Sequence, residues 1–83
     1  MTRELPFKCF VGDEPEICEN MFSGKKVCLP ADAVAVYDVI IGGQLMAEKT
    51  SDPKMRDKMY EEVRKGLDWF LEHEPHAYSV LLD

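Results

Sequence analysis

The clearest pattern in the chain is an amphipathic one over residues 52–74. Apolar side chains recur there every three or four residues, which is the spacing of one face of an α-helix, and charged side chains fill the opposite face. Ser51-Asp52-Pro53 is a helix start, because Ser and Asp cap free backbone N–H groups and Pro suits the first turn. Pro75 ends the pattern, since the residue before a proline avoids the helical region. The pattern predicts a helix over 52–74 that packs its apolar face on a core.

Gly66 lies in the middle of that apolar face. A glycine inside a helix costs roughly 1 kcal/mol relative to alanine. We therefore expect another element to pass close to Gly66, so that a larger side chain there would collide with it.

A second long apolar segment covers residues 31–47. Its valines and isoleucines have strand character, whereas the Pro-x-Asp opening, the alanines and the length favour a helix. We predict a helix that ends near Gly42-Gly43 or continues to Glu48. Wound as a helix, the segment is apolar on nearly every side, which is typical of an element that is buried all round.

The remaining segments are shorter. Residues 7–11 are aromatic and β-branched, which predicts a strand or an extended segment that covers the core. A short helix is expected over 15–22, capped by Asp13, with Ile17 and Met21 facing inward. A strand is expected over 26–29 that pairs with 7–11. The apolar tail, 76–83, is expected to fold back as one or two helical turns, with a short strand as the alternative.

These elements predict a mainly α fold in one domain, 1–83. Helices 31–47 and 52–74 form a hairpin, with a short N-terminal β pair or extended arm and a C-terminal segment that closes the core. A chain of this length buries only roughly 60–65% of its extended surface, so its stability is marginal when it stands alone.

Charge narrows the classes of function. The net charge is −6, from 16 acidic and 10 basic residues, which argues against a nucleic-acid binder and against binding to an anionic membrane surface. The chain has no apolar run as long as a transmembrane helix and no apolar leader at its start. Three cysteines without a secretion signal indicate reduced thiols, so we expect a cytoplasmic protein.

Candidate chemistry is sparse. Cys9, Cys18 and Cys28 with a histidine, either His73 or His76, would supply zinc ligands, but no close C-x-x-C pair is present. A zinc-binding domain is therefore the alternative hypothesis. No nucleophile elbow, phosphate loop or H-E-x-x-H motif is found, and a domain this small rarely encloses a substrate cavity. The sequence predicts no enzyme and no cofactor.

Three stretches carry a resemblance: MFSGKKVCLPADAVAVYDVIIGG, VRKGLDWFLEHEP and AYSVLLD. Together they resemble a group of small uncharacterised proteins encoded by marine bacteriophages, including cyanophages. The resemblance covers most of residues 20–83. It implies a phage-encoded protein that acts in the cytoplasm of an infected bacterium, and it brings no activity, cofactor or catalytic residue.

The expected function is that of a non-enzymatic interaction or accessory protein that binds a host or phage protein. Two groups of residues are the predicted contacts: the second face of helix 31–47, with Val36, Val39 and Met46, and the acidic cluster of Asp13, Glu14, Glu16 and Glu19. Helix 52–74 covers only one side of helix 31–47. A monomer would then expose a contiguous apolar patch, so we also expect a two-fold homodimer that covers it.

Overall fold

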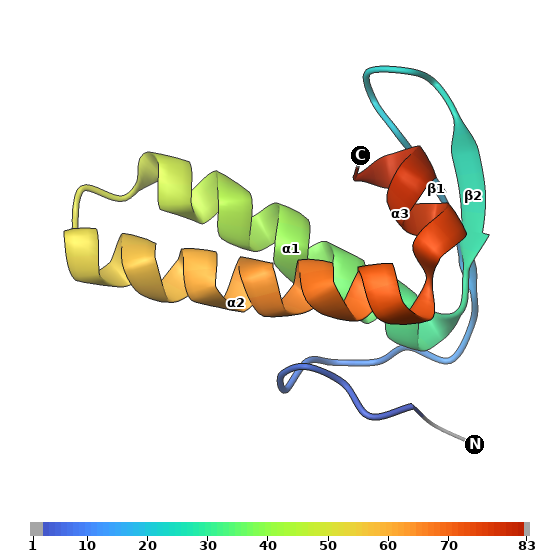
Figure 1. The fold of residues 1–83 in the computed structure, drawn as a ribbon, viewed down its shortest axis with the longest axis horizontal. Coiled ribbons are helices and arrows are strands. Elements are labelled where there is room, and N and C mark those ends of the chain that lie inside the picture. The colour runs from blue at the N-terminus through green and yellow to red at the C-terminus, as the bar shows by residue number, and fades with distance from the viewer. Residues whose placement is uncertain (1–2, 83) are drawn as a thin grey trace.

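Two long antiparallel helices form the body of the protein, in a computed structural model that describes residues 3–82 (Figure 1). The elements are, in chain order, β1 (Glu16–Glu19), β2 (Lys26–Leu29), α1 (Ala31–Lys49), α2 (Pro53–His73) and α3 (Pro75–Leu81). The β pair stands at the end of the helical hairpin where α1 begins and α2 ends, and α3 lies beside it (Figure 1). The predicted mainly α fold with a helical hairpin and a short β pair is confirmed.

The boundaries of α2 follow the predicted signals. The Asp52 carboxylate accepts a hydrogen bond from the backbone N–H of Lys54 at 3.0 Å, and Pro53 occupies the first turn. The helix ends at His73 and Pro75 opens α3, because a proline suits the first turn of a new helix and not the interior of an old one. Local capping chemistry therefore sets both ends of this helix.

The helical interpretation of the second apolar segment is correct, and α1 continues through Gly42-Gly43 to Lys49. Gly43 faces α2, where a Cβ atom would lie 2.9 Å from Cγ2 of Val63. The glycine that weakens the helix locally is thus the residue that lets the two backbones come together.

Gly66 is the second point of close approach, as the sequence predicted. A Cβ atom there would lie 2.6 Å from Cγ1 of Ile40 on α1, and 3.4 Å from Cε2 of Phe7 in the N-terminal segment. The isoleucine therefore fills the space that a side chain on α2 would need. Together with the contact of Gly43, this places one small residue on each helix against a β-branched residue of the other.

The core lies where the two helices meet β2 and α3. Its largest fully buried side chains are Phe70, Leu29, Ile40 and Val36. The Trp69 and Phe70 rings pack edge to face with centroids 5.6 Å apart, which is a favoured aromatic geometry. Ala77 and Leu81 of α3 close the core at the end that carries the β pair.

One of the two segments that form the β pair differs from the predicted one. Residues 7–11 form no strand and 15–22 form no helix; instead Glu16–Glu19 pairs antiparallel with Lys26–Leu29. The connecting residues turn tightly, with Gly24 at a φ of 76°, a backbone region that glycine adopts readily. A hairpin satisfies the backbone of both segments locally, whereas the predicted arrangement needed a longer connection.

Residues 3–9 form an arm along the helical hairpin (Figure 1). The alternative prediction was an extended segment over 7–11 that covers the core; Phe7 packs on the core, whereas Phe10 is 91% exposed and Val11 is 38% exposed. Leu5 and Phe7 pack against the core, and the Trp69 indole N–H donates a hydrogen bond to the carbonyl of Glu4 at 2.8 Å. At the other end of the chain, the tail is helical, as α3; the predicted tail extended to Asp83, which lies outside the described residues.

We predict that Gly66→Leu lowers the free energy of unfolding by about 1–3 kcal/mol, the usual cost of overpacking, although leucine favours a helix. The physical reason is the collision with Ile40. Gly42→Ala is the matched control, because a Cβ there meets nothing within 4 Å, and it should gain up to about 1 kcal/mol. Denaturant unfolding measures both. A Gly66→Leu protein as stable as the parent would contradict the close approach.

Candidate protein-interaction surfaces

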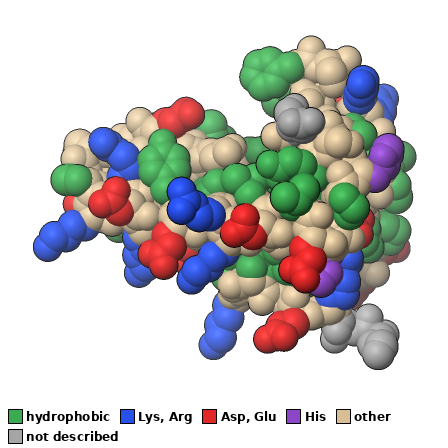
Figure 2. Space-filling model, in the orientation of Figure 1, with side chains coloured by type: hydrophobic (Ala, Val, Ile, Leu, Met, Phe, Trp, Pro, Cys, Tyr) green, Lys and Arg blue, Asp and Glu red, His purple; other side chains and the backbone are tan. Residues whose placement is uncertain are grey.

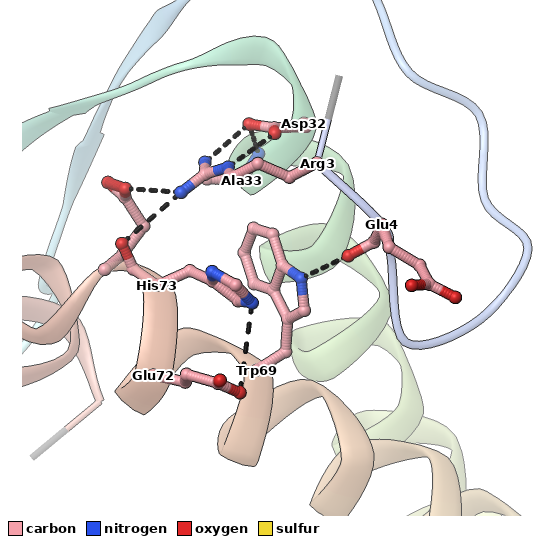
Figure 3. Close-up of polar contacts among 8 residues, drawn as sticks. Arg3, Glu4, Asp32, Ala33, Trp69, Glu72 and His73 are labelled. Carbon is pink, nitrogen blue, oxygen red and sulfur yellow. Dashed lines mark hydrogen bonds and ion pairs between the residues drawn. The ribbon is translucent and has the colours of Figure 1, made fainter. Parts of the chain in front are cut away.

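Arg3 ties the N-terminal arm to both long helices (Figure 3). Its guanidinium donates two hydrogen bonds of 2.8 Å to the carboxylate of Asp32, at the start of α1, and one of 2.9 Å to Glu74, just after α2. The same group lies 4.8 Å from the centroid of the Trp69 ring, within the range of a cation–π contact. These contacts hold the start of the arm against the beginning of α1 and the end of α2.

The hydrogen bonds from Arg3 also change acid–base behaviour. They hold the pKa of the Asp32 carboxyl below its ordinary value, partly offset by burial, while the hydrogen bond to Asp32 raises the pKa of Arg3. Both side chains are partly shielded from water, which makes this pair stronger than an exposed one.

One outward surface is carried by the β pair, and we call it the hairpin surface: Ile17, Met21, Phe22 and Cys28. Ile17 and Cys28 are paired in register and point away from the core, whereas Cys18, Val27 and Leu29 face it. Met21 is 94% exposed and Phe22 is fully exposed. Exposed apolar side chains that are gathered on one surface mark interaction sites more often than singly scattered ones do.

The turn that presents Met21 and Phe22 is held by Asn20. The side-chain oxygen of Asn20 accepts hydrogen bonds from the N–H groups of Phe22, at 2.8 Å, and Ser23, at 3.3 Å. Its amide donates a hydrogen bond of 2.9 Å to the carbonyl of Val80 on α3. The exposed apolar pair is thus displayed from an anchored turn.

The predicted acidic cluster is exposed throughout, at Asp13, Glu14, Glu16 and Glu19. Two of these residues, Glu14 and Glu16, line a shallow cavity of about 190 Å³ together with Asp38 and the ring of Phe10, which is 91% exposed. Its lining has three carboxylates and no lysine or arginine. The cluster is therefore available to a cationic group of a partner, although it holds no group that identifies one.

The predicted contact face of α1 needs correction. Val36 is fully buried in the core, so a partner cannot reach it, while Val39 is half-buried and Met46 is exposed. The prediction assumed that only the other long helix covers α1. In the structure β2 also contacts α1, because the short β pair folds onto the start of that helix, and Phe7 of the N-terminal arm and Ala77 of α3 pack on the same core.

The structure also contains a groove along α2 that the sequence did not predict. It has a volume of about 650 Å³ and lies where α1, α2 and α3 meet; its lining residues are Gln44, Tyr60, Val63, Arg64, Leu67, Asp68 and Tyr78. Figure 2 shows hydrophobic side chains in the hollow between the helical hairpin and α3, with charged side chains of both signs along its border. The groove is wide and open, unlike an enclosed substrate cavity.

The three cysteines are free thiols and are not gathered in one place. Cys18 and Cys28 lie on opposite faces of the β pair, and Cys9 lies in the arm. Burial raises the pKa of Cys9 and of Cys18, which disfavours the thiolate that nucleophilic or metal chemistry needs. Among residues 3–82, no group of three or more His, Cys, Asp or Glu side chains is arranged to hold a metal ion.

Sequence reasoning missed Met21 and Phe22 because it placed them in a helix with Met21 turned inward. The Ser23-Gly24 dipeptide is a turn signal, and two short segments with β-branched residues flank it, which is the pattern of a hairpin. Arg64 and Asp68 were assigned to the solvated face of helix 52–74, and nothing in the sequence shows that α3 folds beside them.

Comparison with known proteins found no protein family that matches the chain, no similar curated protein and no similar solved structure. Within residues 3–82, no helix has both the length and the hydropathy to cross a bilayer.

We predict that part of the acid sensitivity of this protein resides in the ion pair of Asp32 with Arg3. Because the folded-state pKa of Asp32 is lowered, its stabilisation is fully present above the ordinary pKa of about 3.9 and is lost as the pH falls through the folded-state value. The free energy of unfolding of Asp32→Asn should therefore fall less than that of the parent when the pH drops below about 4. Asp57→Asn, at an exposed carboxylate, is the control; equal pH slopes for the parent and Asp32→Asn would contradict this.

We predict that the protein keeps its far-ultraviolet helical signal when a chelator and a reductant are added together. The core is made of apolar side chains that pack against one another, and we expect this packing to hold the helices together by itself. The free energy of a structural metal is folding free energy, so unfolding by the chelator alone would reveal a metal site and favour the zinc hypothesis.

Proposed function

We propose that this protein is a non-enzymatic interaction protein that binds a host or phage protein in the cytoplasm of a phage-infected bacterium. The phage setting rests on the resemblance of residues 20–83 to marine bacteriophage proteins. The cytoplasmic setting rests on the three cysteines, which are all free thiols in the structure.

The observation that carries this proposal is the hairpin surface. Phe22 and Met21 are almost wholly exposed, yet the turn beneath them is hydrogen-bonded to α3 through Asn20. An aromatic side chain on an anchored turn loses little conformational freedom when it enters a pocket, which is the usual chemistry of an interface anchor. We therefore assign Phe22 as the central contact and Met21 and Ile17 as its neighbours.

Charge indicates the kind of partner. Glu19 shares the outward face of β1 with Ile17, while Asp13, Glu14 and Glu16 precede Ile17 in the chain; all four carboxylates are exposed. A partner with an apolar pocket and a basic rim would complement this arrangement, and charge complementarity at a rim mainly raises the rate of association. The acidic cluster thus keeps the role expected for it, as the rim of an interface and not its centre.

The zinc-binding alternative has no observation in its favour among residues 3–82, where no three His, Cys, Asp or Glu side chains are grouped so that they could hold a metal ion. An enzymatic role lacks support as well. The groove beside α3 is open, and burial raises the pKa of Cys9 and of Cys18, which disfavours the nucleophilic thiolate.

The proposal includes a two-fold homodimer. A chain of 83 residues has a small core, and a second copy would add buried apolar surface. Besides the hairpin surface, the helices also leave large apolar side chains exposed, among them Leu45, Met46, Tyr60 and Leu71. Two-fold dimers are the commonest oligomers of soluble chains, and they use one patch twice.

We predict that Phe22→Ser abolishes partner binding and leaves the fold intact. Tagged parent protein would be recovered from bacteria during phage infection, and the protein that co-purifies would be expressed and titrated against each variant. The loss of a central aromatic anchor costs about 2 kcal/mol or more, so the Kd should rise more than tenfold. Met55→Ser, which changes an exposed apolar residue at the start of α2, is the control. Equal affinity of the parent and Phe22→Ser would contradict the hairpin surface.

A further inference from the structure

We propose that the homodimer forms through α2, with two copies of this helix packed antiparallel along a seam of Tyr60, Arg64, Leu67 and Leu71. This inference rests on the proposed homodimer and adds the surface and the contacts. Tyr60 is 45% exposed and Leu71 is 55% exposed, so the seam has an uncovered apolar residue at each end.

The spacing of the seam is symmetric. Its intervals are four, three and four residues, which is the pattern of one helix face in a coiled coil. Read from either end the pattern is the same, so a two-fold axis at its centre brings Tyr60 of each copy against Leu71 of the other. The same operation places Arg64 against Leu67 of the other copy. A face that is its own complement is what an isologous contact requires.

The charges beside the seam are complementary under the same operation. Arg64 and Asp68 both line the groove, and neither forms an ion pair with any other group of residues 3–82. Within one helix their order, with the base four residues before the acid, is the less favourable one. Across the two-fold axis Arg64 lies next to Leu67 of the second copy, and therefore within reach of its Asp68. Two reciprocal ion pairs result.

The groove supplies the space for this contact. Val63, Leu67 and Tyr78 give it an apolar floor, and Tyr60, Arg64 and Asp68 border it. Figure 2 shows the hollow open on this face, with acidic and basic side chains alternating along α2. A helix of a second copy that lies along α2 would project its apolar residues toward this floor, in the helix-in-groove mode of recognition.

Two other surfaces are less suited than the α2 seam to a symmetric contact between two copies. Antiparallel pairing of two β1 strands about their centre would set Glu16 opposite Glu19 of the other copy, and like charges in cross-strand pairs are destabilising. The face of α1 that the sequence favoured has Val36 fully buried in the core, so that residue is closed to a second copy. The α2 seam is the surface on which both the apolar spacing and the charges match under a two-fold operation.

Sedimentation equilibrium at micromolar concentrations tests the seam. The parent should have twice the chain mass of 9.5 kDa. Arg64→Asp alone and Asp68→Arg alone each place like charges together at both pairs, so each should weaken the dimer about tenfold or more. The double variant, with both changes, reverses each pair and should return to within about threefold of the parent. Both residues are exposed, so circular dichroism should show an unchanged fold.

A matched control is available on the other side of the same helix. Lys58 and Glu62 are also four residues apart and exposed, but they lie away from the seam. Lys58→Glu and Glu62→Lys should leave the mass and the dissociation constant of the parent unchanged.

Each other result overturns part of the proposal. A parent that is monomeric throughout overturns the homodimer and the seam, while the partner binding of the hairpin surface keeps its own separate test. A dimer that resists both single swaps, or that the double variant fails to restore, overturns the seam and leaves the homodimer. A monomeric parent that binds a different protein through Arg64 and Asp68 assigns the groove to that protein and overturns the second copy as its occupant.

Discussion

The structure depends on the close approach of α1 and α2 at two glycines. Gly66 leaves room for Ile40, and Gly43 leaves room for Val63, so the helices interlock by shape as well as by apolar burial. A glycine inside a helix lowers its intrinsic stability, and tight packing of the opposing side chain offsets that cost. Phe70 and Val36 complete this contact as fully buried residues. The helical hairpin then provides the surface on which the shorter segments fold.

The shorter segments close the core at the end where α1 begins and α2 ends, by polar contacts as much as by apolar ones. Arg3 joins the start of α1 to the end of α2, and Trp69 donates to the backbone of the arm. Asn20 joins the turn of the β pair to α3. A two-stranded β pair is weak alone and needs packing against a helix. The β pair of this protein obtains that packing from α3 and the start of α1, and so its turn can hold exposed apolar side chains.

Two of the open surfaces that carry apolar side chains differ in character. The hairpin surface is small, protrudes and is flanked by acids, which suits insertion of Phe22 into the pocket of another protein. The groove along α2 is concave, and its border carries both a base and an acid, which suits a symmetric contact. The two surfaces are built on different elements, so a dimer through α2 is compatible with partner binding through the hairpin. A dimer with two hairpins would also bind a multivalent partner with higher avidity.

The sequence by itself determined the two long helices, the ends of α2, the close approach at Gly66 and the extended arm as one of two alternatives. Those features depend on local signals: capping residues, prolines and a helical apolar period. Only the tertiary structure decided that Glu16–Glu19 is a strand, that Val36 is core, that Phe22 is exposed and that α3 forms a groove beside Arg64. In a segment of four residues the local preferences for helix and for strand differ little. Its secondary structure is therefore decided by the segment of the same chain with which it pairs. The helix α1 is apolar on almost every side, so the side that becomes buried depends on where distant segments of the chain fold. The local sequence pattern does not contain that information.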